Sequence, residues 1–128
     1  MNIKTIYFAV TCLLLATALI PAARAEEIDV RLLACAIENA AGGESYTVMV
    51  SLGAVLLNRL SDESYPSSLA AVIADAGIDI SVIEPSSRAL RAAADAMGGF
   101  DPTCGALHYE VGEYDGEVAL ATDSWFFY

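Results

Sequence analysis

Apolar residues at helical spacing dominate the middle of the chain. Between residues 46 and 59 they recur every three or four positions, which places them on one face of a predicted helix. These residues are Val48, Leu52, Val55 and Leu56. An earlier stretch, residues 30–41, predicts another helix whose core face consists of Leu32, Leu33, Ala36 and Ile37. Gly42 and Gly43 separate the two helices, because glycine readily takes the left-handed conformation that closes a helix.

The rest of the pattern predicts two more helices and a small sheet. The ranges are 67–74 for a short helix, 84–97 for a longer helix, and 106–111 and 117–121 for two strands that pair with each other. Alternation of apolar and polar residues over 75–83 favours a short strand or an extended loop. The aromatic end, residues 125–128, has no element assigned to it. The chain is therefore predicted to be an α+β protein, mainly α-helical with a small antiparallel sheet.

The first 25 residues have the pattern of a secretory signal peptide. Lys4 gives a basic start, and residues 6–20 form an apolar core that is short for a membrane span. Pro21 ends this core, and Ala23-Arg24-Ala25 is a small-residue cleavage signal. Cleavage after Ala25 would leave one exported domain, residues 26–128, without a stable membrane span. The alternative is an uncleaved N-terminal anchor.

The charge balance is strongly acidic. The chain has 6 basic and 17 acidic residues and a net charge of −11. Lys4 and Arg24 would leave with the signal peptide, so the exported domain would keep only arginines as its basic residues. Such a surface repels nucleic acid, which excludes nucleic-acid binding, while a neutral glycan remains compatible with it. No repeat or second domain is visible, and we expect a monomer.

Five short motifs, in matching order and spacing, resemble the cell wall hydrolase domain of the spore-cortex-lytic (SleB/CwlJ-like) family. They are Gly43-Glu44-Ser45-Tyr46, Leu57-Asn58-Arg59-Leu60, Tyr65-Pro66-Ser67, Gly99-Phe100-Asp101-Pro102-Thr103 and Ala106-Leu107-His108-Tyr109. The resemblance covers roughly residues 30–126. It implies a small lysozyme-like domain that cleaves the glycan strands of peptidoglycan as a glycosidase or lytic transglycosylase, without a cofactor.

The position that the resemblance makes catalytic is occupied by alanine. The family has its catalytic glutamate four residues before the glutamate that matches Glu44, and this position is Ala40 here. Alanine cannot protonate a leaving oxygen, so the candidate acids are Glu44 itself and Glu38. Two residues along a helix correspond to a rotation of about 200°, which predicts that Glu38 points away from Ala40. The alternative role of Glu44 is to satisfy backbone N–H groups at a helix start.

A protein of this family that has lost its acid would be a peptidoglycan-binding module without turnover, and this is the alternative function. In either case the candidates for substrate binding are Tyr46, Asn58, Asp79, Tyr109 and Trp125. Aromatic side chains suit the flat faces of sugars, although aromatic residues are also common in protein cores. Asn58, with Arg59, has a structural alternative, which is to attach its helix to a carboxylate.

Two cysteines offer further chemistry. Export would place Cys35 and Cys104 in an oxidising environment, which favours one disulfide between the first helix and the loop after Asp101. Two reduced thiols are the alternative. Cys35 and the only histidine, His108, could also form a thiol enzyme, but no cysteine-peptidase signature surrounds Cys35. One histidine and separated cysteines make no zinc cluster, so we expect neither a metal nor a cofactor.

Overall fold

A computed structural model describes residues 29–81 and 84–128. After a helix over residues 29–41 come α2 (Tyr46–Leu60), α3 (Leu69–Asp75) and α4 (Ser87–Met97). The strands are β1 (Tyr109–Val111), β2 (Leu120–Thr122) and β3 (Trp125–Phe127). The predicted α+β class, mainly helical with a small antiparallel sheet, is confirmed. The predicted signal peptide lies outside the described residues, among which no helix is long and apolar enough to cross a membrane.

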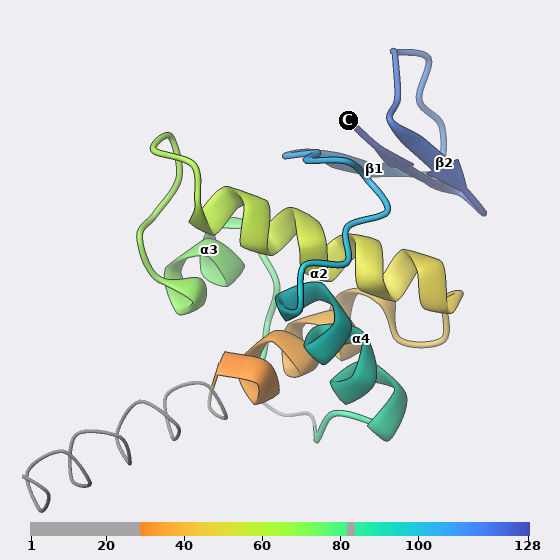
Figure 1. The fold of residues 1–128 in the computed structure, drawn as a ribbon. Coiled ribbons are helices and arrows are strands. Elements are labelled where there is room, and N and C mark those ends of the chain that lie inside the picture. The colour runs from red at the N-terminus through yellow and green to blue at the C-terminus, as the bar shows by residue number, and fades with distance from the viewer. Residues whose placement is uncertain (1–28, 82–83) are drawn as a thin grey trace, which may run out of the picture.

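Helix α2 is the centre of the fold. Its residues from Val48 to Leu56 are all buried, so the helix is enclosed on every side. In Figure 1 it crosses the middle of the molecule, with α4 below it and the sheet above. A Cβ atom on Gly53 would lie 3.0 Å from Ile37 Cδ1 and 3.2 Å from Ala96 Cβ. The absence of a side chain at Gly53 therefore lets the first helix and α4 pack closely against α2.

Serine side chains begin three of the helices. Ser45, Ser68 and Ser86 are the N-caps of α2, α3 and α4, and each accepts a hydrogen bond from the backbone N–H three residues later. The helix predicted from residue 84 thus begins at Ser87. At the other end of the first helix, Gly43 has φ +86°, the left-handed conformation that the glycine pair predicts.

The strand order differs from the prediction. Strand β3 lies between β1 and β2 and is antiparallel to both, so Phe126 faces Glu110 on one side and Ala121 on the other. The predicted pairing of the first two strands is wrong, because the aromatic end supplies the central strand. Trp125 and Phe127 are buried, and as alternate residues of one strand they attach the same face of the sheet to the core.

Candidate functional site

A cleft of about 500 Å³ opens where three distant parts of the chain meet. The corner before α2 contributes Asn39, Ala40 and Glu44. The connection after α3 contributes residues 76–79, and the sheet contributes Tyr109, Val111 and Trp125. This volume is in the range of small-ligand sites, and the wall combines apolar side chains with a few polar groups. The cleft is therefore the candidate functional site.

Glu44 is held in this cleft through its backbone. Its N–H donates to the carbonyl oxygen of Ala41 at 3.1 Å, and its own carbonyl accepts from Arg88 Nη1 at 2.8 Å. The side chain is half-buried, and within residues 29–81 and 84–128 it makes no hydrogen bond or ion pair. The main chain is thus fixed while the carboxyl group remains available to a ligand.

Asp79 adds a second carboxyl group with a different environment. Its Oδ1 accepts from Ser81 Oγ at 2.7 Å and from Ser81 N–H at 2.9 Å. These hydrogen bonds, first that of the hydroxyl and then that of the backbone, hold the pKa of Asp79 below its usual range. Residues 76–81 form a loop, which is one of the two structures that the sequence predicted for this stretch. Asp79 is therefore a fixed negative charge at the cleft.

Aromatic rings form the wall of the cleft on the side of the sheet. Tyr109 and Trp125 stack with centroids 5.6 Å apart, and Trp125 stacks in turn on Phe127 at 6.1 Å. Burial raises the pKa of Tyr109, against the opposing effect of the nearby Arg59 guanidinium. The Tyr109 hydroxyl therefore keeps its proton at neutral pH. The wall offers flat apolar area together with a hydroxyl donor.

Two buried nitrogen donors on the cleft wall have no partner among the residues that the structure describes. They are Asn39 Nδ2 and Trp125 Nε1. A buried donor without an acceptor costs free energy, so such groups are normally satisfied by protein, water or ligand. Asn39 was not predicted from the sequence; the one available signal is that it is a polar residue directly before Ala40, the position that the family resemblance makes catalytic.

Asn58 has a structural role. Its Nδ2 donates to Asp101 Oδ2 and to the carbonyl oxygen of Ala106, both at 3.0 Å. Asp101 also accepts from the hydroxyl and N–H of Thr103 and from the N–H of Gly105. Asn58 therefore attaches the end of α2 to the loop before β1, which is the structural role given above as the alternative to substrate binding. It does not line the cleft.

Arg59 continues this attachment into the sheet. Its Nε donates to the carbonyl oxygen of Leu107 at 2.7 Å. Its guanidinium lies 5.1 Å from the ring centroid of Tyr65 and 5.6 Å from that of Tyr109. This cation–π contact helps to hold the Tyr109 ring in place. Motifs that are separate in the sequence thus act together to place one aromatic wall of the cleft.

Glu38 and Tyr46 lie outside the cleft. Glu38 Oε2 accepts from Ser86 Oγ at 2.7 Å, at the start of α4, where a negative charge is favourable. Tyr46 donates its hydroxyl proton to Asp95 of α4. Of the candidate residues, the cleft thus brings together Glu44, Asp79, Tyr109 and Trp125.

The expected disulfide is not present in the structure, and His108 lies outside the cleft. No disulfide joins Cys35, half-buried in the first helix, to Cys104. Cys104 is exposed because the turn around Asp101 leaves its side chain toward solvent. His108 is exposed and stacks on Tyr128, with centroids 5.2 Å apart, away from the residues of the cleft. Among the described residues no cluster of three or more metal-ligating side chains is found.

Comparisons with known proteins agree on one family. A spore cortex-lytic enzyme of Bacillus subtilis (strain 168) is 39% identical over 87 residues, which is 63% of this chain but only 28% of that enzyme. The catalytic domain of the Bacillus cereus SleB protein superposes with a TM-score of 0.65 and 29% identity, over 77% of this chain and 88% of that domain.

A second solved structure, the catalytic domain of a germination-specific lytic transglycosylase, SleB of Bacillus anthracis, gives a TM-score of 0.63 and 28% identity. It covers 77% of this chain and 92% of that domain. The lysozyme-like fold expected from the resemblance is the fold of these neighbours. Residues 43–125, more than half of the chain, match the model of the Cell Wall Hydrolase family, and the chain therefore belongs to that family.

Proposed function

We propose that the cleft binds glycan strands of peptidoglycan and that the protein cleaves them as a glycosidase or lytic transglycosylase, with Glu44 as the proton donor. The observation that carries this proposal is the carboxyl group of Glu44, which lines the cleft on a fixed backbone and has no side-chain partner among the residues that the structure describes. The names of the relatives, a spore cortex-lytic enzyme and a germination-specific lytic transglycosylase, support the substrate class.

The two carboxyl groups of the cleft suit different steps. Hydrogen bonds from Ser81 keep Asp79 ionised, so Asp79 can stabilise the positive charge that develops on the sugar but cannot act as the acid. The Glu44 carboxyl group accepts no hydrogen bond from the described residues, and we assign to it the transfer of a proton to the glycosidic oxygen as the bond of that oxygen to the anomeric carbon breaks.

In a transglycosylase the 6-hydroxyl of the same sugar then bonds to the anomeric carbon. The proton of that hydroxyl returns to the Glu44 carboxylate, so the acid is restored and no second catalytic carboxyl group is needed. In a hydrolase, water takes the place of the hydroxyl. Tyr109 and Trp125 would hold the sugar against the aromatic wall.

A binding module without turnover is the second candidate, and Ala40 is the observation that favours it. Ala40 lies on the cleft wall at the position where the family resemblance places the catalytic glutamate. If Glu44 serves only to contact the sugar, the cleft would hold a glycan strand without breaking it.

Product analysis separates the two functions. The protein is incubated with purified peptidoglycan, the soluble products are identified by mass spectrometry, and co-sedimentation with the insoluble wall is measured in parallel. Anhydro-muropeptides indicate a lytic transglycosylase, and reducing-end products indicate a hydrolase. Sedimentation without release, together with release by Ala40→Glu, would indicate the binding module. Neither release nor sedimentation would contradict both functions.

Such a substrate requires the protein to act outside the cytoplasm, at the cell wall or the spore envelope. The signal-peptide pattern of residues 1–25 supports this location. We further propose that the domain acts as a monomer, since the cleft is formed within a single chain.

A further inference from the structure

Two of the four arginines that the structure describes lie together at one place on the surface of this acidic protein. Among the described residues, Arg31 forms an ion pair with Glu84 at 2.7 Å, and Arg59 is engaged by a backbone carbonyl. The other two arginines, Arg88 and Arg91, both line a second depression of about 440 Å³ on the surface of α4. In a chain with a net charge of −11, this grouping calls for an explanation.

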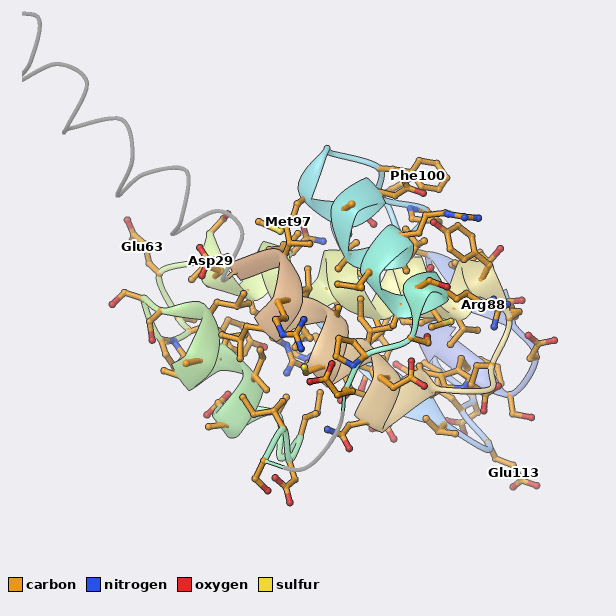
Figure 2. All side chains as sticks on the ribbon, turned by 90° about the horizontal axis from the view of Figure 1, so that it is seen from below. Asp29, Glu63, Arg88, Met97, Phe100 and Glu113 are labelled. Atoms are coloured by element: carbon orange, nitrogen blue, oxygen red, sulfur yellow. The ribbon has the colours of Figure 1, made fainter. Side chains whose placement is uncertain are left out.

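We call this depression the arginine pocket; its lining residues are Tyr46, Ser87, Arg88, Arg91 and Asp95. Arg88 reaches outward beside α4 at the margin of the molecule (Figure 2), with its guanidinium 6.0 Å from the ring centroid of Tyr46. Asp95 follows Arg91 by four residues, a spacing at which helical ion pairs form. Its carboxylate accepts instead from Tyr46, and the described residues contain no ion pair between Arg91 and Asp95.

The arginine pocket adjoins the cleft. Arg88 Nη1 donates to the carbonyl oxygen of Glu44, whose side chain lines the cleft. Tyr46, two residues further on, lines the arginine pocket. The two sites are therefore connected through one short segment of the chain, residues 44–46. A polymer seated in the cleft can reach the arginine pocket through a short side branch.

We propose that the arginine pocket binds a carboxylate of the peptide stems that branch from peptidoglycan glycan strands. The inference rests on the proposed function, because it needs the glycan strand to lie in the cleft. A guanidinium and a carboxylate form paired, charge-assisted hydrogen bonds, and Arg91 has no competing ion pair within the described part of the chain. Ser87 adds a hydroxyl donor at the same rim. The pocket thus selects strands that carry peptides.

The test compares two soluble ligands: muropeptide oligomers with their peptide stems, and the same glycan after an amidase has removed the peptides. Binding is measured by calorimetry in a Glu44→Gln background, so that the ligands stay intact. We expect Arg91→Gln to weaken binding of the peptide-bearing ligand roughly fivefold, as one exposed charge-assisted contact would, and to leave the peptide-free glycan unaffected. Arg31→Gln is the matched control, because it removes the same charge from a pair outside the pocket.

Each other outcome has a defined meaning. If Arg91→Gln weakens the binding of both ligands equally, or weakens the binding of neither, the inference is overturned while the proposed function stays in place. Binding of neither ligand by the Glu44→Gln parent, with no cleavage by the wild type, would remove the proposed function and the inference with it. Displacement of the peptide-bearing ligand by inorganic phosphate but not by acetate, at equal ionic strength, would assign the pocket to phosphate and overturn the peptide assignment. Thermal melting of each variant verifies that folding is intact.

Discussion

Glu38 and Ala40 lie two residues apart on one helix and face different parts of the molecule. Ala40 lines the cleft, while Glu38 accepts hydrogen bonds from Ser86 at the start of α4. The rotation of about 200° between them accounts for this separation. The carboxylate nearest in sequence to the expected catalytic position therefore stabilises a helix start. Glu44, four residues after Ala40 and beyond the end of that helix, is the glutamate that lines the cleft.

At the residue scale, Asp101 predicts a loss of stability in acid. Burial by itself raises the pKa of Asp101, but hydrogen bonds from Thr103, Asn58 and Gly105 outweigh it and hold the pKa below its usual range. A carboxyl group with a lowered folded-state pKa stabilises the protein fully above its unfolded-state pKa, and this stability is lost as the pH falls through the folded-state value. We expect Asp101→Asn to lower the free energy of unfolding by roughly 1 kcal/mol at pH 7, since the group is only partly buried.

The difference between wild type and Asp101→Asn should shrink below about pH 4, which urea titrations at neutral and acidic pH would measure. Asp29→Asn is the control, because Asp29 is exposed and has the same charge. A difference that stays constant from pH 7 to pH 3 would contradict the assigned hydrogen bonds.

At the scale of elements, the helices and the two outer strands were predictable, and the central strand of the sheet was not. Each helix is long enough for its apolar spacing to repeat, and a serine marks the start of three of them. Strand β3 has only 3 residues, all of them aromatic, so no alternation of apolar and polar positions marks it. The turn between β2 and β3 uses Asp123 at φ +50° and Ser124, without the glycine that usually marks a hairpin. The central strand β3 was therefore missed.

The same limit applies to the site. The motif around Glu44 and the aromatic residues Tyr109 and Trp125 were predicted from the sequence. Residue types and the order and spacing of motifs can be compared without knowing which residues are in contact. Whether Asn58 faces a ligand or the protein depends on where the loop before β1 folds back onto α2. That contact joins residues 48 positions apart, which local patterns do not reveal.

Gly53 gives a prediction for helix packing. Gly53→Ala places a Cβ atom 3.0 Å from Ile37 Cδ1 and 3.2 Å from Ala96 Cβ, so three helices must shift apart. The better helix propensity of alanine offsets up to about 1 kcal/mol of a packing cost of roughly 1–3 kcal/mol. We expect a net loss of about 1 kcal/mol in the free energy of unfolding, measured by urea denaturation. An increase in stability would show that the helices do not pack at this distance.

At the scale of the whole molecule, a strongly acidic chain carries the cleft and one arginine pocket. The net charge of −11 disfavours contact with nucleic acid and with anionic surfaces. The cleft needs no positive charge to bind a sugar, because its walls offer aromatic faces, a hydroxyl and nitrogen donors. Arg88 and Arg91, which form no ion pair with the residues that the structure describes, line the arginine pocket beside the cleft, where a charged branch of a polymer could meet them.

Export gives a prediction for the whole chain. The small-residue signal ending at Ala25 predicts that the protein collected from outside the cytoplasm begins at Glu26. Intact-mass measurement of the exported protein tests this directly. Replacing Ala25 with a bulky residue should block processing, and Ala22 offers a control in the same segment outside the signal triplet. A mature protein that retains residues 1–25 would indicate an anchor.

The most direct test of the account compares two glutamates in one cleavage assay. Release of soluble muropeptides from peptidoglycan is followed over time for the wild type, Glu44→Gln and Glu38→Gln. Both changes remove one negative charge, but only Glu44 lines the cleft. We predict that Glu44→Gln slows release by about 100-fold or more, the usual effect of losing a general acid, whereas Glu38→Gln stays within about twofold of the wild type. Full activity of Glu44→Gln, or its loss in Glu38→Gln with the fold intact, would contradict the assignment of the acid to Glu44.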